Sequence, residues 1–160
     1  MSPYDALDRW IDVHHAAQVE FLREIVRVPS DTPPGDNAPG AEKAASLLDA
    51  LGFRVERYPV PEAFLRDYGM RSVTNLIVRR KFGRGSGPVV ALNAHCDVVP
   101  PGSGWTVDPY GAVERNGALY GRGAAVSKSD FATYAFALLA LEQHPGLDGT
   151  VELHFTYDEE

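Results

Sequence analysis

The sequence predicts a single α/β domain, and two patterns lead to that prediction. Apolar residues recur at helical spacing in several stretches, and runs of strand-forming residues lie between and after them. Helices that alternate with strands are typical of layered α/β domains. A length of 160 residues with a hydrophobic content of 44% suits one domain with one core.

The N-terminal third predicts two helices separated by a loop. Apolar residues at helical spacing predict a helix over residues 4–28, and Pro29 ends it. Residues 30–37 are almost all turn-forming types and predict a loop. A second amphipathic helix is expected to follow, with Gly52 placed to end it and an apolar face made of Ala44, Leu47, Leu48 and Leu51.

The middle of the chain predicts strands. Residues 53–58 alternate apolar and charged types, which indicates a half-buried strand, and a short helix is expected over 63–67. Residues 73–80 predict a strand, and 88–94 predict a fully buried one. The glycine-rich segment 83–87 between them is expected to be a hairpin or flexible turn, because a phosphate-binding loop would precede a helix.

The last third predicts irregular chain, a helix and a final strand. Residues 105–123 are rich in glycine and proline and contain one expected short strand, 118–120. Apolar spacing predicts a long helix over 127–143. Residues 150–157 are rich in β-forming types and predict a strand.

A histidine and an aspartate follow the strand predicted at 88–94. Residues two apart on an extended chain point the same way, so His95 and Asp97 are expected to share one site while Cys96 faces away. A histidine beside a carboxylate suits a metal ligand whose second ring nitrogen is held by the acid. The alternative interpretation is a polar turn at the end of a strand.

Three consecutive acids, Asp158, Glu159 and Glu160, follow the last predicted strand. Adjacent carboxylates repel, so they need a cation or a shared proton to coexist in a cleft. One of them can bind a metal while its neighbour activates water. A solvated acidic turn is the alternative interpretation.

A tight glycine turn, residues 121–123, leads into the helix predicted at 127–143. Ser127 and Asp130 form the Ser-x-x-Asp pattern of a capping box, which explains Asp130 without any function. The glycines let the backbone pass close to a site, or simply make the corner.

Together these segments resemble one family, the zinc metallohydrolases that include acetylornithine deacetylase, succinyl-diaminopimelate desuccinylase, aminoacylase and related carboxypeptidases and dipeptidases. The resemblance covers nearly the whole chain. The segments that carry it, in order, are residues 92–100, Trp105, 108–110, 116–124 and 156–160.

The resemblance implies a role for each site residue. His95 matches a histidine that binds one of two metal ions, and Asp97 matches the acid that orients it. Glu159 matches the general base that takes a proton from the metal-bound water, and Glu160 matches a ligand of the second metal. The implied cofactor is Zn²⁺, with Co²⁺ or Mn²⁺ as alternatives.

The chain departs from the family pattern at Val126. Family members carry there an aspartate that bridges both metals, and valine cannot bind a metal. Asp130 is the nearest carboxylate, about one helical turn further on. Either Asp130 is a metal ligand that replaces the bridge, or the second metal is weakly held or absent.

The implied architecture is a three-layer α/β/α zinc-peptidase-like catalytic domain that is incomplete at its C-terminus. Residues 1–160 match the N-terminal part of that domain. The remaining ligands and the lid and dimerisation domain of the family follow the Glu159–Glu160 position, so this piece alone is expected to be inactive. A homodimer is expected only through that absent lid domain.

The implied function is hydrolysis of an amide or peptide bond in a small N-acyl amino acid or short peptide. The alternative is a catalytically degenerate, metal-poor member of the fold that acts as a binding or scaffold protein. Fifteen basic against twenty-two acidic residues argue against nucleic-acid and membrane partners. One cysteine, and no signal-like or membrane-spanning segment, predict a cytoplasmic protein.

Overall fold

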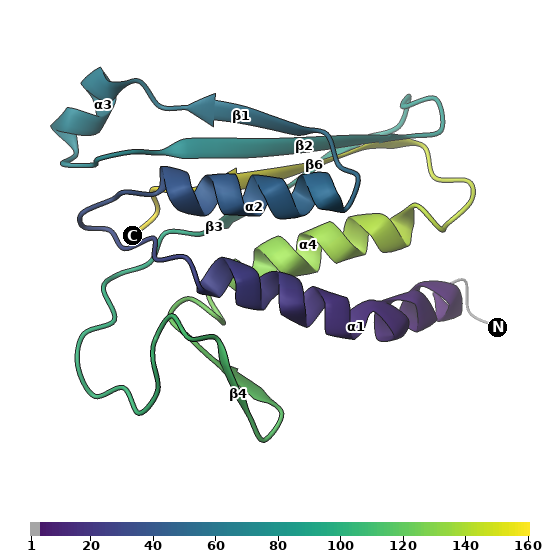
Figure 1. Ribbon diagram of the computed structural model, residues 1–160. Helices are drawn as coiled ribbons and strands as arrows, with labels where there is room; N and C mark the ends of the chain where they lie inside the picture. Colours follow the sequence, from purple (N-terminus) through teal and green to yellow (C-terminus); the bar gives the residue numbers. More distant parts are fainter. Residues whose placement is uncertain (1–3) are drawn as a thin grey trace.

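The computed structural model describes residues 4–160 and builds from them a sheet with helices on one face, plus a small separate hairpin (Figure 1). The helices and strands follow one another in mixed order, as an α/β domain requires. The elements are α1 (Asp5–Val26), α2 (Ala38–Ala50), β1 (Val55–Pro59), α3 (Glu62–Asp67), β2 (Thr74–Phe82), β3 (Val89–His95), β4 (Val113–Arg115), β5 (Ala118–Tyr120), α4 (Lys128–Leu141) and β6 (Gly149–Thr156).

The main sheet has the strand order β1-β2-β6-β3. Strand β6 is central, since it pairs antiparallel with β2 and parallel with β3. The parallel register sets His95 opposite Thr156, so β3 and β6 end at the same edge of the sheet. In parallel sheets this carboxyl edge is where ligands are usually bound.

The helices form two layers on one side of the sheet. Helices α2 and α4 pack on the strands, and α1 packs against both of them (Figure 1). Because α4 lies between α1 and the sheet, it buries residues on several sides, among them Phe131, Phe136 and Leu138. The core they share with the sheet includes Leu76, Val78, Leu153, Phe155 and Tyr157.

The predicted α/β class is confirmed, and each predicted helix and strand overlaps one that the structure contains. Helix α2 spans Ala38–Ala50 and contains Ala44, Leu47 and Leu48 of the predicted apolar face. Among residues 4–160, none of the helices combines the length and the apolar character that crossing a bilayer requires.

The prediction that residues 88–94 form a fully buried strand was wrong. Within residues 4–160, β3 has a strand neighbour on one side only, and Val89 and Val90 are 65% and 48% exposed. The segment 83–87 is also not a hairpin, because β6 lies between the two strands that it connects. The apolar run is therefore an edge strand of the described sheet. The spacing of apolar residues alone cannot distinguish an edge strand from a central one.

The irregular stretch before α4 contains two short strands where one was expected. Strands β4 and β5 pair antiparallel around Asn116 and Gly117, whose φ angles are 52° and 73°. Two positive φ angles at the centre of a two-residue loop are typical of the tight turn that Asn-Gly favours. The Asn116-Gly117 dipeptide therefore indicates a hairpin, and with it the additional strand β4.

Strand β6 should contribute more to stability than the exposed end of β3. Leu153 is fully buried, so Leu153→Ala should lower the free energy of unfolding by about 2–5 kcal/mol. Val90→Ala, at a half-exposed position, should cost less than about 1 kcal/mol. Urea unfolding followed by circular dichroism measures both variants, and equal losses would contradict the edge position of β3.

Candidate metal centre

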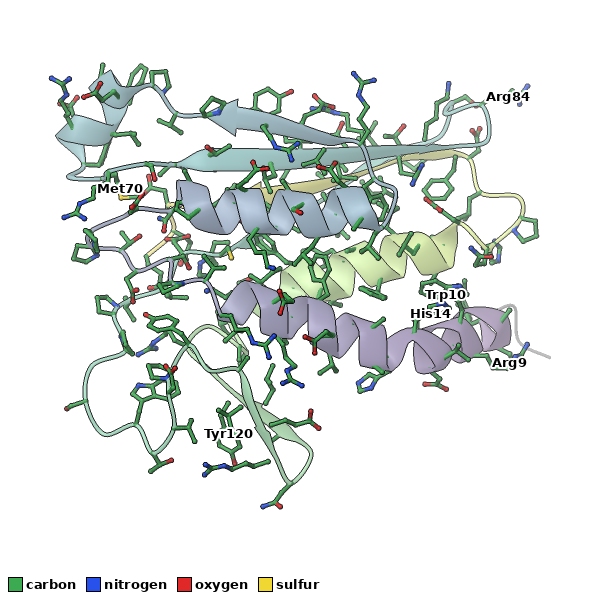
Figure 2. The ribbon with its side chains drawn as sticks, in the orientation of Figure 1. Arg9, Trp10, His14, Met70, Arg84 and Tyr120 are labelled. Atoms are coloured by element: carbon green, nitrogen blue, oxygen red, sulfur yellow. The ribbon has the colours of Figure 1, made fainter. Side chains whose placement is uncertain are left out.

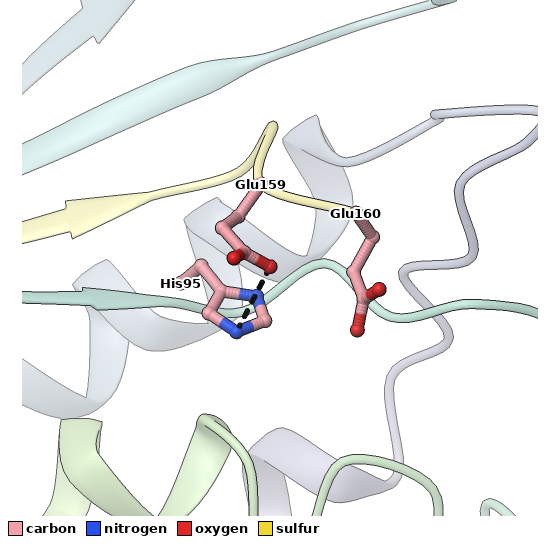
Figure 3. Close-up of side chains that lie close together, drawn as sticks. All are labelled: His95, Glu159 and Glu160. Atoms are coloured by element: carbon pink, nitrogen blue, oxygen red, sulfur yellow. Dashed lines mark ion pairs between the residues drawn. The ribbon is translucent and has the colours of Figure 1, made fainter.

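Three side chains with metal-binding groups meet at the carboxyl edge of β3 and β6 (Figure 3). His95 is the last residue of β3, and the next backbone N–H, that of Cys96, donates to the Thr156 carbonyl at 3.0 Å. The chain leaving β6 then turns, and this turn places Glu159 and Glu160 beside the His95 ring. Strand pairing thus brings together residues that are far apart in the sequence.

One ligand atom from each of His95, Glu159 and Glu160 lies within 4.8 Å of the other two. His95 Nε2 is 3.5 Å from a carboxylate oxygen of Glu159. The His95 side chain is 11% exposed and that of Glu159 is 63% exposed. No other group of three such residues was found among residues 4–160. The structure thus brings His95, Glu159 and Glu160 together at one point.

Asp97 is completely buried and connects the two strand ends. Its Oδ2 accepts the backbone N–H groups of Glu159 and Glu160 at 2.9 and 3.0 Å. A buried carboxylate needs such donors, and these two fix the turn that carries both glutamates. Its Oδ1 is 3.5 Å from His95 Nδ1 and, within the described chain, has no hydrogen-bond partner.

These groups fit a divalent metal ion. One imidazole nitrogen and two carboxylates are a usual ligand set for Zn²⁺ and also suit Co²⁺ or Mn²⁺. The second ring nitrogen, His95 Nδ1, is 3.1 Å from the Asp97 backbone carbonyl and 3.5 Å from the carboxylate Oδ1, so a partner that can hold the ring lies behind the histidine. Asp97 thus lies behind the His95 ring and outside the group of three candidate ligands.

Two polar residues of the loop after α1 hold the strand ends in place. Ser30 Oγ donates to the Cys96 carbonyl at 2.6 Å, and Asn37 Nδ2 donates to the Tyr157 carbonyl at 3.2 Å. Both side chains are buried. Sequence reasoning did not select Asn37, because a polar residue in a turn-rich loop looks the same whether it is exposed or buried.

Lys128, at the start of α4, is buried against the end of α1. Its Nζ donates to the carbonyls of Val28 at 3.0 Å and Ile25 at 3.4 Å. The cation thereby compensates carbonyl groups at a helix C-terminus, where positive charge is favourable. Burial lowers the pKa of Lys128 from its ordinary value. Lys128 thus holds α1 against the glycine turn. Because lysine side chains usually lie at the surface, this role could not be predicted from the sequence.

Cys96 points away from the candidate centre, as the alternation predicted. Its side chain is buried in the core, and that burial raises the pKa of the thiol to about 11. Burial also raises the pKa of the neighbouring Tyr157 hydroxyl. The thiol is thus kept protonated near neutral pH, which makes it a poor ligand or nucleophile.

Asp130 lies outside the group formed by His95, Glu159 and Glu160, as far as the described residues show. Its carboxylate accepts the Ser127 hydroxyl at 2.7 Å. The predicted capping box was wrong, since within residues 4–160 neither side chain caps the first turn of α4 and the two bond to each other instead. Val126, the position of the missing bridge, is 67% exposed.

The sequence comparisons agree with the geometry. Residues 91–160 match the profile of Peptidase family M20/M25/M40. The succinyl-diaminopimelate desuccinylase of Bordetella petrii is 40% identical over 150 residues, which cover 91% of this chain and 35% of that enzyme. The chain is related to the M20 peptidases. It spans about a third of the length of the curated relatives that it matches.

Solved structures of other proteins share the fold of this chain. Human carnosine dipeptidase 1 superposes with a TM-score of 0.70 at 24% identity, covering 99% of this chain and 35% of that one. The di-peptidase Dug1p of Saccharomyces cerevisiae gives a TM-score of 0.76 at 17% identity, covering 98% and 35%. At these identities the likeness concerns the fold.

Removing the charge of Asp97 should weaken metal binding. Asp97→Asn keeps the size of the side chain but loses the carboxylate that faces His95 and fixes the glutamate turn, so affinity should fall about 10–100-fold. Titration of the chain with Co²⁺, followed by its visible absorption, measures the change. Asp130→Asn is the matched control and should leave the affinity unchanged; equal losses in both variants would contradict the role of Asp97.

Proposed function

We propose that this chain carries part of the active site of a metal-dependent hydrolase that cleaves an amide or peptide bond. The observation that supports the proposal most is the grouping of His95, Glu159 and Glu160 at the carboxyl edge of the sheet, with Asp97 behind the histidine. The relative that is 40% identical supports the same chemistry, since it is a succinyl-diaminopimelate desuccinylase.

Each residue of the centre has one role in the proposed reaction. His95 and Glu160 hold the metal ion, and Asp97 keeps the His95 ring in the orientation that leaves Nε2 toward the ion. When bound, a divalent ion polarises the scissile carbonyl and lowers the pKa of a coordinated water. Glu159 accepts a proton from the attacking water and delivers it to the leaving nitrogen.

Exposure distinguishes Glu159 from His95 but not from Glu160, which is exposed as well. A general base must reach both the water and the substrate, and the Glu159 side chain is 63% exposed while His95 is nearly buried. Glu159 lies close enough to His95 to bind the same ion, so the two roles need a variant that separates them. We assign Glu159 rather than Glu160 as the base because Glu159 holds the position of the base in the family that the chain resembles.

The finer features of the proposal follow the family resemblance. The substrate is a small N-acyl amino acid or short peptide, the preferred ion is Zn²⁺, and the protein acts in the cytoplasm. Residues 1–160 supply the N-terminal part of the catalytic domain, and other segments supply the remaining ligands and any dimer contact. Val126, which has no metal-binding atom at the position of the family's bridging aspartate, favours a second candidate, a metal-poor binding protein with the same fold.

Glu159→Gln should abolish turnover and leave metal binding largely intact. The amide keeps the size of the side chain but cannot accept the proton, and a general base typically contributes about 10²–10⁴-fold to the rate. The full-length polypeptide is assayed with an N-succinyl amino acid and a dipeptide, and its metal content is measured by elemental analysis.

Glu152→Gln is the matched control, because Glu152 lies in β6 and pairs with Arg79 on the sheet. That variant should keep full activity. Activity within threefold of wild type in Glu159→Gln would remove Glu159 as the base. Loss of the metal in the same variant would show that Glu159 is a ligand.

Val126→Asp should raise the affinity for a second metal ion. Two dications close together repel each other, and a carboxylate between them reduces that repulsion. Wild type should therefore hold one ion firmly, through His95 or Glu160, and a second one weakly. Elemental analysis after dialysis gives the stoichiometry. Two firmly held ions in wild type, with one lost in Asp130→Asn, would show that Asp130 supplies the bridge.

A further inference from the structure

A cavity lies beside the candidate metal centre, between α3 and the end of β6. Its volume is about 120 Å³, and Asp158, the residue before Glu159, forms part of its lining. Helix α3 and the C-terminus lie at the same end of the sheet in Figure 1, and Figure 2 places Met70, another lining residue, at that end. A molecule held there lies next to the glutamate turn.

The inner wall of this cavity is apolar. Leu65, Met70 and Val73 line it and are themselves at most 9% exposed, so they belong to the fixed core. Whole small-molecule pockets usually measure about 300–1,000 Å³, so the cavity has room for one arm of a ligand. An aliphatic chain is the group that gains most from such a wall.

The rim of the cavity selects for positive charge. Phe64 and Tyr68 line it and are 62% and 77% exposed, and aromatic faces attract cations. Among the described lining residues, Asp158 is the one charged side chain. Asn75 also lines the cavity. Its Oδ1 is buried and, within residues 4–160, accepts no hydrogen bond. Acceptors and aromatic faces together suit an N–H donor.

We propose that this cavity binds the aliphatic amine arm of a ligand, with its alkyl chain on the apolar wall and its ammonium group at Asp158 and the aromatic rim. If the proposed hydrolase function holds, the ligand is a substrate with an amino-terminated side chain, and the cavity determines specificity. Binding of the amine itself does not depend on that function.

The chain offers a direct probe, because it contains two methionines, Met1 and Met70. Labelling the methionine methyl groups with ¹³C gives one signal from a residue that lines the cavity, which Met70→Leu assigns. The 160-residue chain is titrated with 1-aminopentane in the presence of EDTA, so that no metal ion can bind the amine. The Met70 signal should shift saturably while the Met1 signal stays constant.

Two ligands of matched length test the chemical class. Pentanoate, with the opposite charge, should leave the Met70 signal unchanged, and neutral 1-pentanol should need about threefold or more higher concentration than the amine. Equal binding of amine and alcohol would show a merely apolar cavity and overturn the proposal. Preference for pentanoate, or no shift with any ligand, would overturn it too.

Substitutions in the lining test which side chains bind the amine. Asp158→Asn should raise the half-saturating amine concentration about threefold, and Phe64→Leu, which removes the ring but keeps an apolar side chain, should have a similar effect. Asp67→Asn is the matched control, since Asp67 ends α3 but is not in the lining. Equal changes in Asp158→Asn and Asp67→Asn would show a general charge effect and remove the site.

The amine and metal titrations separate the two proposals. Amine binding without Co²⁺ binding would leave the cavity as a binding site and remove the hydrolase function. Co²⁺ binding without any shift of the Met70 signal would remove the amine site alone. Circular dichroism of each variant confirms that the fold is kept.

Discussion

The buried carboxylate of Asp97 is the interaction on which the candidate centre depends. A charge removed from water must be compensated inside the protein, and here the donors are the N–H groups of Glu159 and Glu160. The same carboxylate faces His95. One requirement, compensation of a single buried charge, therefore fixes the end of β3, the turn after β6 and the relative position of three functional side chains.

Polar residues from distant parts of the chain fix the surroundings of Asp97. Ser30 and Asn37 hold the carbonyls that follow β3 and β6, and Lys128 joins the end of α1 to the start of α4. These are buried hydrogen bonds, which are costly to leave unmade. The support is rigid at the backbone, whereas the Glu159 side chain remains largely exposed and free to change its position.

Features set by local pattern could be predicted from the sequence, and features set by distant neighbours could not. Alternation placed His95 and Asp97 on one side and Cys96 on the other, and the strand ends located the glutamates. Sequence could not show that β3 is an edge strand, that Asn37 is buried, or that Ser127 bonds the Asp130 side chain, because each depends on what packs alongside. Residues of α3, β2 and the final turn together line the cavity at Asp158, so no single segment of the sequence predicts it.

The pairing of β3 with β6 also determines when the centre can form during folding. Asp97 and Glu159 are 62 residues apart in sequence, and closing so large a loop costs more entropy than forming the local β4–β5 hairpin or any helix. A partly folded chain with α1, α2 and the β1–β2 pair has none of the three metal-binding side chains in place. Metal ions can therefore stabilise this chain only after a strand pairing between residues 61 apart in sequence is complete, which couples the onset of metal affinity to a late stage of folding.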